Sequence, residues 1–259
     1  MSYIFLDTET HSKENPILIQ LAYIRTKPDG MDATKWLEDE VCNQLFSTGG
    51  PKIEFWAMAV HHITEKQIEG LETFNQSYIK DVSQKFFYEH GYILIAHNAP
   101  FDVWVLKNHG VEVPTYICTL KLARYVYPEF EAHNLQYLRY RLGLEFDKEI
   151  NPHDAMSDVY VLEKLFYHLS KKLAEKLAEE INNDPRKLND STTLIQIMIE
   201  ITRAPSLLYR CVFWKHAGKL WSEVPRDYLM WIVDKSDMSD DDVMHTARYY
   251  LSGNTSLPV

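Results

Sequence analysis

The stretch that decides the fold is residues 3–10, which read YIFLDTET. Four apolar or aromatic residues lead directly into two carboxylates, Asp7 and Glu9. If this run is a strand, residues two apart point to the same face, so Asp7 and Glu9 share one face of the sheet. Two like charges at the end of a buried strand repel each other and are costly to desolvate. A bound divalent cation is the simplest compensation for them.

The segments around this stretch predict an α/β domain. Residues 17–25 form a second apolar run after a polar turn, and a third strand is expected at 41–46. From residue 91 onward strands alternate with helices, and the hairpin-like start makes the sheet mixed. Strands are expected at 92–96 and 116–119, and helices at about 73–89, 101–109, 120–126, 135–142, 155–170 and 192–201.

Composition narrows the class of protein. The 259 residues are 46% hydrophobic, enough for a sizeable core, and no run of eighteen apolar residues predicts a membrane span. The N-terminus lacks the pattern of a secretory signal. The three cysteines form no CxxC pair, so we expect a reduced, cytoplasmic protein without a zinc site. A net charge of −10 argues against a salt-driven nucleic-acid coat protein, but not against an enzyme that meets nucleic acid through a metal.

Two further carboxylates stand at the starts of predicted helices. Asp158 falls on the apolar stripe of its helix, three residues after Ala155 and four before Leu162. Asp102 lies in the first turn of another helix, in line with Val105. Taken singly, each could be a cap or a helix N-terminal charge, but a carboxylate on an apolar face needs a partner. Four carboxylates without cysteine favour Mg²⁺ or Mn²⁺, and two such ions roughly 3.5–4 Å apart suit in-line displacement at phosphorus.

A general base is then required, and His153 is the candidate. It stands five residues before Asp158 and would not share a helix face with it, so we expect it on a loop over the metal site. A neutral imidazole there could take a proton from water near pH 7. Taken alone, one of eleven histidines is more often a surface residue.

Three short motifs carry a family resemblance. Residues 7–10 (DTET), 97–102 (HNAPFD) and 153–158 (HDAMSD) resemble, in order and spacing, the three motifs of the DEDDh exonucleases. This resemblance implies an α/β, ribonuclease H-like exonuclease fold with a mixed central sheet flanked by helices. In the family, four acidic residues bind two metal ions and a histidine is the general base. The roles of metal ligand carry over to Asp7, Glu9, Asp102 and Asp158, and the role of base to His153.

The resemblance extends to most of the chain. Residues 57–65 and 117–124, and several stretches after residue 203, resemble the exonuclease X group of the family. Two departures stand out: His11-Ser12-Lys13 replaces a small residue, glycine and an apolar residue, so that Lys13 would reach for phosphate, and Trp214 replaces a glycine. We predict an exonuclease domain at 1–170, a helical extension and linker at 171–190, and a small, mainly helical, exonuclease X-like module at 191–259.

We therefore predict a 3′→5′ exodeoxyribonuclease that uses two Mg²⁺ ions, with Mn²⁺ able to substitute. It should release nucleoside 5′-monophosphates from single-stranded DNA or from the 3′ ends of duplexes, and leave a 3′-hydroxyl. Thr10, His62 and Asn98, which flank or resemble motif positions, are the expected substrate contacts.

Two alternatives remain. One is an exoribonuclease of the same fold, because no residue in the sequence indicates whether the site accepts or excludes the 2′-hydroxyl of RNA. The other is a tethering protein in DNA repair or replication with an idle nuclease core, in which residues 191–259 recruit a partner. Competent residues at all five catalytic positions disfavour this second alternative. The aromatic and basic residues after Arg203 could stack on bases and hold phosphates, or could form a small satellite core.

Overall fold

The computed structural model describes residues 2–28, 36–147, 149–183, 191–211, 213–235 and 240–255. The chain divides into two compact units. The first comprises residues 1–119 and 134–168, and the second comprises 120–133 and 169–259. The boundaries at 170 and 190 that the sequence suggested stay a prediction.

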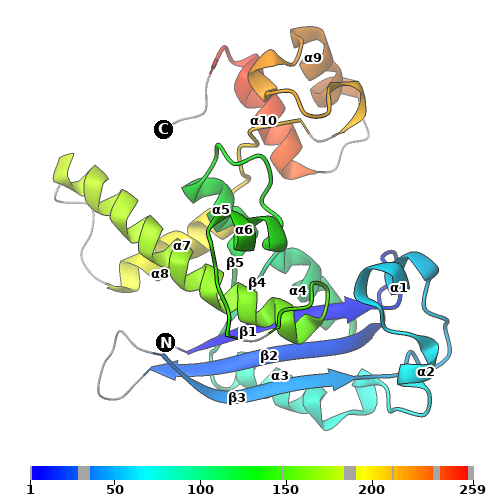
Figure 1. Ribbon diagram of the computed structural model, residues 1–259. Coiled ribbons are helices and arrows are strands. Elements are labelled where there is room, and N and C mark those ends of the chain that lie inside the picture. Colours follow the sequence, from blue (N-terminus) through cyan, green and yellow to red (C-terminus); the bar gives the residue numbers. More distant parts are fainter. Residues whose placement is uncertain are drawn as a thin grey trace. The chain divides into compact units, whose positions relative to one another are not determined.

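The first unit is built on a five-stranded mixed sheet (Figure 1). Its strand order is β3-β2-β1-β4-β5, with β1 antiparallel to β2, β2 antiparallel to β3, and β1, β4 and β5 parallel. The mixed sheet that the sequence predicted is therefore confirmed. The strands are β1 (Tyr3–Thr10), β2 (Leu18–Pro28), β3 (Trp36–Leu45), β4 (Ile93–Ala96) and β5 (Tyr116–Cys118).

Helices cover both faces of this sheet (Figure 1). Tyr3 and Phe5 of β1 contact Phe166 of α7 (Ala155–Asn183), with ring centroids 5.3 and 5.5 Å apart. Tyr23, on the opposite face, contacts Phe86 of α3 (Tyr78–Tyr88) at 5.7 Å. Since side chains alternate along a strand, the residues that continue the Tyr3 and Phe5 series lie on the α7 face. Asp7 and Glu9 are those residues.

The remaining elements of the first unit are short helices. Predicted helix 73–89 is interrupted: a 3₁₀ turn ends at Gln76, and α3 begins after Ser77, whose backbone is extended. The reason is local, because the Gln76 side chain accepts a hydrogen bond from the backbone N–H of Thr73 at 3.2 Å and closes a separate turn. The other helices are α1 (Phe55–His61), α2 (Glu65–Ile68), α4 (Ala99–Asn108) and α6 (Leu135–Arg141), with η1 at Phe74–Gln76.

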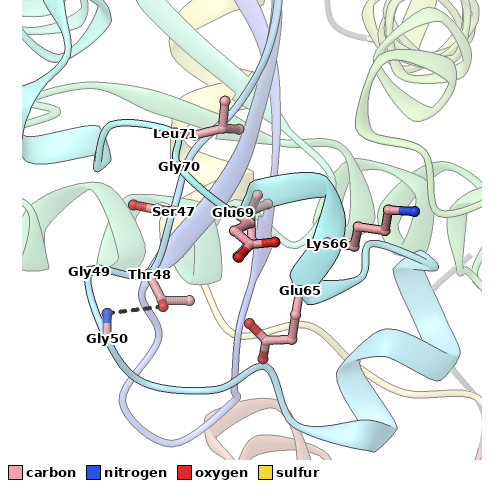
Figure 2. Close-up of a pocket in the computed structure, with 10 residues that line it drawn as sticks. Ser47, Thr48, Gly49, Gly50, Glu65, Lys66, Glu69, Gly70 and Leu71 are labelled. Atoms are coloured by element: carbon pink, nitrogen blue, oxygen red, sulfur yellow. Dashed lines mark hydrogen bonds between the residues drawn. The ribbon is translucent and has the colours of Figure 1, made fainter.

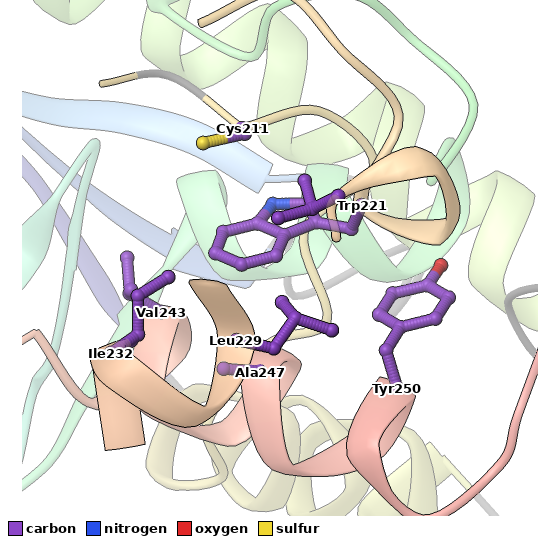
Figure 3. Close-up of a cluster of buried hydrophobic side chains, with 8 residues drawn as sticks. Cys211, Trp221, Leu229, Ile232, Val243, Ala247 and Tyr250 are labelled. Carbon is purple, nitrogen blue, oxygen red and sulfur yellow. The ribbon is translucent and has the colours of Figure 1, made fainter. Parts of the chain in front are cut away.

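The second unit is mainly helical, as the sequence predicted for its C-terminal part. Its elements are α5 (Thr119–Val126), the second half of α7, α8 (Ser191–Arg203), η2 (Trp214–His216), η3 (Trp221–Glu223), α9 (Arg226–Lys235) and α10 (Asp241–Leu251). Trp221, fully buried, centres a small core with Leu229 and Ile232 of α9 and Val243 of α10 (Figure 3). Within the described ranges, no helix is long and apolar enough to cross a membrane.

Candidate functional site

The first two carboxylates lie where β1 outruns its parallel neighbour. β4 pairs with β1 only as far as Phe5, whereas β2 continues beside Asp7 and Glu9. The pairing with β2 becomes irregular between Glu9 and Thr10, so the strand bends directly after the carboxylates. Both side chains are half-buried at this open edge. The strand therefore presents two carboxylates on the face that α7 covers.

Asp102 reaches the same place from α4. The helix follows β4 through Asn98, whose positive φ of 66° turns the chain sharply from strand to helix. Asp102 is only 3% exposed. The hydroxyl of Thr8 donates to Asp102 Oδ1 at 2.8 Å, across 94 residues of sequence. This hydrogen bond joins the first and second motifs.

Asp158 comes from the first turn of α7 and is 8% exposed. Its Oδ1 accepts from the side-chain amide of Gln136 at 2.6 Å, and its Oδ2 accepts from the backbone N–H of His153 at 3.1 Å. Asp154 accepts from the backbone N–H of Ser157 at 3.0 Å and so caps the N-terminus of α7. His153 lies outside the helix, exposed on the turn before it, as its spacing predicted.

The carboxylates act on one another electrostatically. Burial raises the pKa of Asp7 well above its usual range, and the charges of Asp102, Glu9 and Asp158 raise it further. Burial raises the pKa of Glu9 to about 8, with Asp158 and Asp102 adding to the shift. A fifth carboxylate, Asp154, contributes in the same direction to both. Motifs some 150 residues apart thus form one cluster of like charge.

Two members of the cluster are held by hydrogen bonds. Burial raises the pKa of Asp102 to about 7, although the Thr8 hydrogen bond opposes this shift. Burial also raises the pKa of Asp158, opposed by hydrogen bonds from His153 and Gln136. Protein donors therefore compensate part of the buried charge at two of the four positions.

The donor set fits a hard divalent cation. Its ligands would all be carboxylate oxygens, and the raised pKa values show negative charge that the protein itself leaves largely uncompensated. As placed, no three His, Cys, Asp or Glu side chains within the described ranges converge closely enough to hold an ion. The four candidate carboxylates therefore lie in one region without forming a coordination shell.

A hollow of about 300 Å³ adjoins Glu9. Of the predicted substrate contacts, Thr10 lines it, whereas His62 and Asn98 are exposed and do not. Its walls combine polar side chains with aromatic side chains and one cationic side chain, that of Lys13. They are Thr8, Glu9, Thr10, Lys13, Trp56, Ala57, Val60, His61 and Phe101.

A buried histidine beside this hollow was not singled out from the sequence. His61 ends α1, and its Nδ1 accepts from the backbone N–H of Ile63 at 2.9 Å. Its Nε2 has no hydrogen-bond partner in the described part of the chain. Burial lowers the pKa of His61, and the neighbouring His62 and His153 lower it further. His61 and the predicted base His153 therefore influence each other electrostatically.

Backbone strain marks the same region. Only three non-glycine residues among those described have positive φ: His62, Asn98 and His153, at 61°, 66° and 62°. Such conformations are uncommon outside glycine and cluster at functional sites. All three were candidate site residues on sequence grounds alone.

A larger hollow, of about 630 Å³, lies among loops that carry none of the candidate residues (Figure 2). Residues 47–50 form one side, with the Thr48 hydroxyl accepting from the N–H of Gly50 at 3.3 Å. Residues 65–71 form the other side, and Glu65 there accepts from the N–H of Ile53 at 2.6 Å. Its size alone therefore does not make it the functional site.

The cluster predicts how metal-free protein responds to pH. Between an unfolded carboxylate pKa of about 4 and the folded values of about 8 for Glu9 and about 7 for Asp102, the folded state binds more protons. The contribution of these two groups to the free energy of unfolding is therefore fully present below the unfolded pKa, and it is lost as pH rises through the folded pKa. In EDTA, Tm should fall between pH 5 and pH 8. Glu9→Gln should show a smaller fall, and an equal fall in both proteins would contradict the coupling.

Gln136 is expected to be a positioning residue. Gln136→Leu removes the donor to Asp158 and should lower the metal affinity or kcat by about 10- to 100-fold. The Mg²⁺ concentration for half-maximal rate should rise, a readout that general destabilisation would not move. Tyr140→Leu, exposed on the same helix, is the control. Unchanged Mg²⁺ dependence in Gln136→Leu would show that the hydrogen bond is incidental.

The chain is similar to known nucleases. A family model described as "Exonuclease" (RNase T) matches residues 4–166. Exodeoxyribonuclease 10 of Escherichia coli (strain K12) is 30% identical over 199 residues, covering 75% of this chain and 78% of that protein. Exonuclease X, solved in complex with 5′ overhanging duplex DNA, matches with a TM-score of 0.52 at 23% identity, covering 77% of this chain and 99% of that one. The nuclease domain of 3′hExo, a DEDDh family member solved with bound rAMP, matches with a TM-score of 0.52 at 15% identity, covering 66% and 92%.

Proposed function

Since the chain belongs to the DEDDh group of the exonuclease family, and is therefore a 3′→5′ hydrolase of phosphodiester bonds, we propose that its substrate is DNA. It removes nucleoside 5′-monophosphates from the 3′ end, and the shortened strand keeps a 3′-hydroxyl. One observation carries this proposal above the others: carboxylates from three distant segments gather around Asp7, whose pKa is raised by burial and then by their charges. The substrate rests on similarity to a DNA-degrading relative from Escherichia coli.

Members of this family typically depend on divalent metal, and Mg²⁺ is the proposed ion, with Mn²⁺ able to substitute. When bound, two such ions supply stabilisation of charge at the phosphate and activation of water. The residues that would hold them are Asp7, Glu9, Asp102 and Asp158. Because these side chains do not converge on one point, metal binding includes their rearrangement. Hydrogen bonds from Thr8 and Gln136 hold two of the four carboxylates, those of Asp102 and Asp158, in the absence of metal.

His153 is the proposed general base. Its backbone N–H donates to Asp158, so His153 lies next to one of the proposed metal ligands. The side chain is exposed, which gives it access to water and substrate. The imidazole takes the proton of the attacking water, and the resulting imidazolium is stabilised by the carboxylates around it.

The hollow beside Glu9 is the proposed seat of the terminal nucleotide. Trp56 and Phe101 offer aromatic surface on which a base can stack. Lys13, the residue that departs from the family pattern, lines the same hollow and supplies a cation for a phosphate. Thr10 offers polar backbone and hydroxyl groups beside Glu9. His62 and Asn98 are proposed as outer contacts, since both are exposed.

The test compares matched DNA and RNA oligonucleotides labelled at the 5′ end. We expect a ladder that shortens one nucleotide at a time from the 3′ end of DNA, with nucleoside 5′-monophosphates as the released product. RNA of the same sequence should be degraded much more slowly. Faster degradation of RNA would make the exoribonuclease alternative correct. Degradation of neither polymer would favour the tethering alternative.

A further inference from the structure

The second unit carries an exposed aromatic side chain, Trp231, next to its core. The ammonium of Lys215 lies 5.0 Å from the ring centroid of Tyr228, and Tyr228 stacks on Trp231 at 5.4 Å and 24°. α9 buries Leu229 and Ile232 against Trp221 (Figure 3). Trp231 lies on the same helix yet is 39% exposed. The satellite core therefore uses one side of α9 and leaves an aromatic side chain toward solvent.

Cations gather around this aromatic pair. Arg210 Nη1 donates to the carbonyl of Gly218 at 2.8 Å, which brings the guanidinium to the turn before Lys219. Gly218 permits that turn through a φ of 86°. Burial lowers the pKa of His216, the charges of Lys219 and Lys215 lower it further, and one carboxylate, Asp227, opposes the shift. Three basic side chains and one acidic side chain thus share a small area.

The net charge of the segment that carries these cations, residues 203–226, contrasts with that of the whole protein. The chain has a net charge of −10, yet residues 203–226 hold five basic residues and one acidic residue. Residues 227–242 reverse this balance, with six aspartates and one lysine. Residues 203–226 are therefore the part of the module that is complementary to a polyanion, and Lys215 brings this charge to Tyr228 at the start of the acidic part.

We propose that Arg210, Lys215, Lys219 and Trp231 form a binding surface for single-stranded DNA. The three cations contact phosphates, and a base stacks on the exposed part of Trp231. Cationic grooves with aromatic platforms are how proteins hold single strands without reading sequence, because every base has a stacking face. The choice of DNA over other polyanions rests on the proposed function.

A second contact on the same chain changes how a long substrate is held. A strand bound by this surface stays at a high effective concentration near the enzyme after each cleavage. The surface should therefore lower KM and raise processivity on long strands. It should leave turnover of a substrate too short to reach it unchanged.

The test uses the full chain in EDTA, so that no cleavage occurs, and fluorescein-labelled oligo(dT). Lys215→Glu/Lys219→Glu should weaken binding by at least about tenfold and reduce the slope of log K against log salt by about 2. Trp231→Ala should weaken binding by about tenfold. Lys85→Glu/Lys107→Glu, with the same charge change at exposed positions of α3 and α4, is the matched control. Equal affinity of the Lys215/Lys219 variant and this control would overturn the proposal.

A second measurement separates this surface from the nuclease chemistry. With Mg²⁺, the Lys215→Glu/Lys219→Glu variant should hydrolyse the p-nitrophenyl ester of thymidine 5′-monophosphate at the wild-type rate, while its KM for oligo(dT) rises. An equal loss on both substrates would place these lysines in the fold or the active site and overturn the proposal. Binding in EDTA does not depend on catalysis, so an inactive enzyme would refute the proposed function without affecting this result.

Discussion

Asp7→Asn is expected to abolish nucleotide release, lowering kcat by at least about a thousandfold, or about 4 kcal/mol of transition-state stabilisation. Asn keeps the size of the side chain and removes the charge that a cation needs. Asp7 interacts with Asp102, Glu9 and Asp158 together, so this one change affects the electrostatics of the whole cluster. Rates should be measured under single-turnover conditions with Mg²⁺.

The same substitution should stabilise the metal-free protein. Burial and four neighbouring carboxylates disfavour the charged form of Asp7, so neutralising it relieves repulsion. In EDTA at pH 8, Tm should rise in Asp7→Asn while activity is lost. Asp147→Asn, at an exposed position in the same unit, should change neither quantity. A near-normal rate in Asp7→Asn would refute the four-carboxylate site.

His153→Asn is expected to lower kcat by about 10²- to 10⁴-fold, the usual contribution of a general base. Asn is the informative replacement because it tolerates the positive φ of 62° at this position, and the backbone N–H to Asp158 is retained. The fold and the Mg²⁺ dependence should therefore stay as in the wild type. Only the proton transfer is removed.

The pH–rate profile distinguishes this role from a structural one. A general base must be unprotonated to act, so the wild-type rate should fall on the acid side, and this fall should be smaller in His153→Asn. His90→Asn, which replaces another exposed histidine, should keep the wild-type profile. An unchanged acid limb in His153→Asn would assign it to a different group, and the nearby His61 would be the first to examine.

The sequence predicts best what depends on local pattern. The apolar run before Asp7 predicts β1, and the stripe through Asp158 predicts the buried face of α7, because each follows from the period of one element. The position of His153 on a turn outside the helix follows from spacing alone. These features place Asp7, Glu9, His153 and Asp158 on their local elements before any tertiary contact is known.

Tertiary partners could not be predicted in this way. Thr8 and Asp102 are 94 residues apart, and Gln136 and Asp158 are 22 apart, so no local period relates them. Gln136 lies in a helix that the sequence predicts, but nothing in that helix indicates that the side chain holds a carboxylate.

The hollow was missed for a related reason. Its walls come from β1, α1 and α4, and α1 is only seven residues long, too short for a helical period to stand out. His61 and His62 are adjacent in the sequence, and only the tertiary fold decides which of them is buried. His61 is buried beside the hollow, whereas His62 is exposed and is the C-cap of α1, with its backbone in the αL conformation. The interruption at Ser77 likewise depends on the Gln76 side chain, which competes with helix continuation.

The most direct test of the central claim is metal-dependent digestion of a 5′-labelled DNA strand by the wild-type protein. If carboxylates from three distant segments form one site for divalent cations, Mg²⁺ should produce a ladder that shortens from the 3′ end. EDTA should abolish this ladder. The Asp7→Asn variant should produce no ladder at any Mg²⁺ concentration. Equal ladders with Mg²⁺ and with EDTA, or from Asp7→Asn and the wild type, would contradict the account.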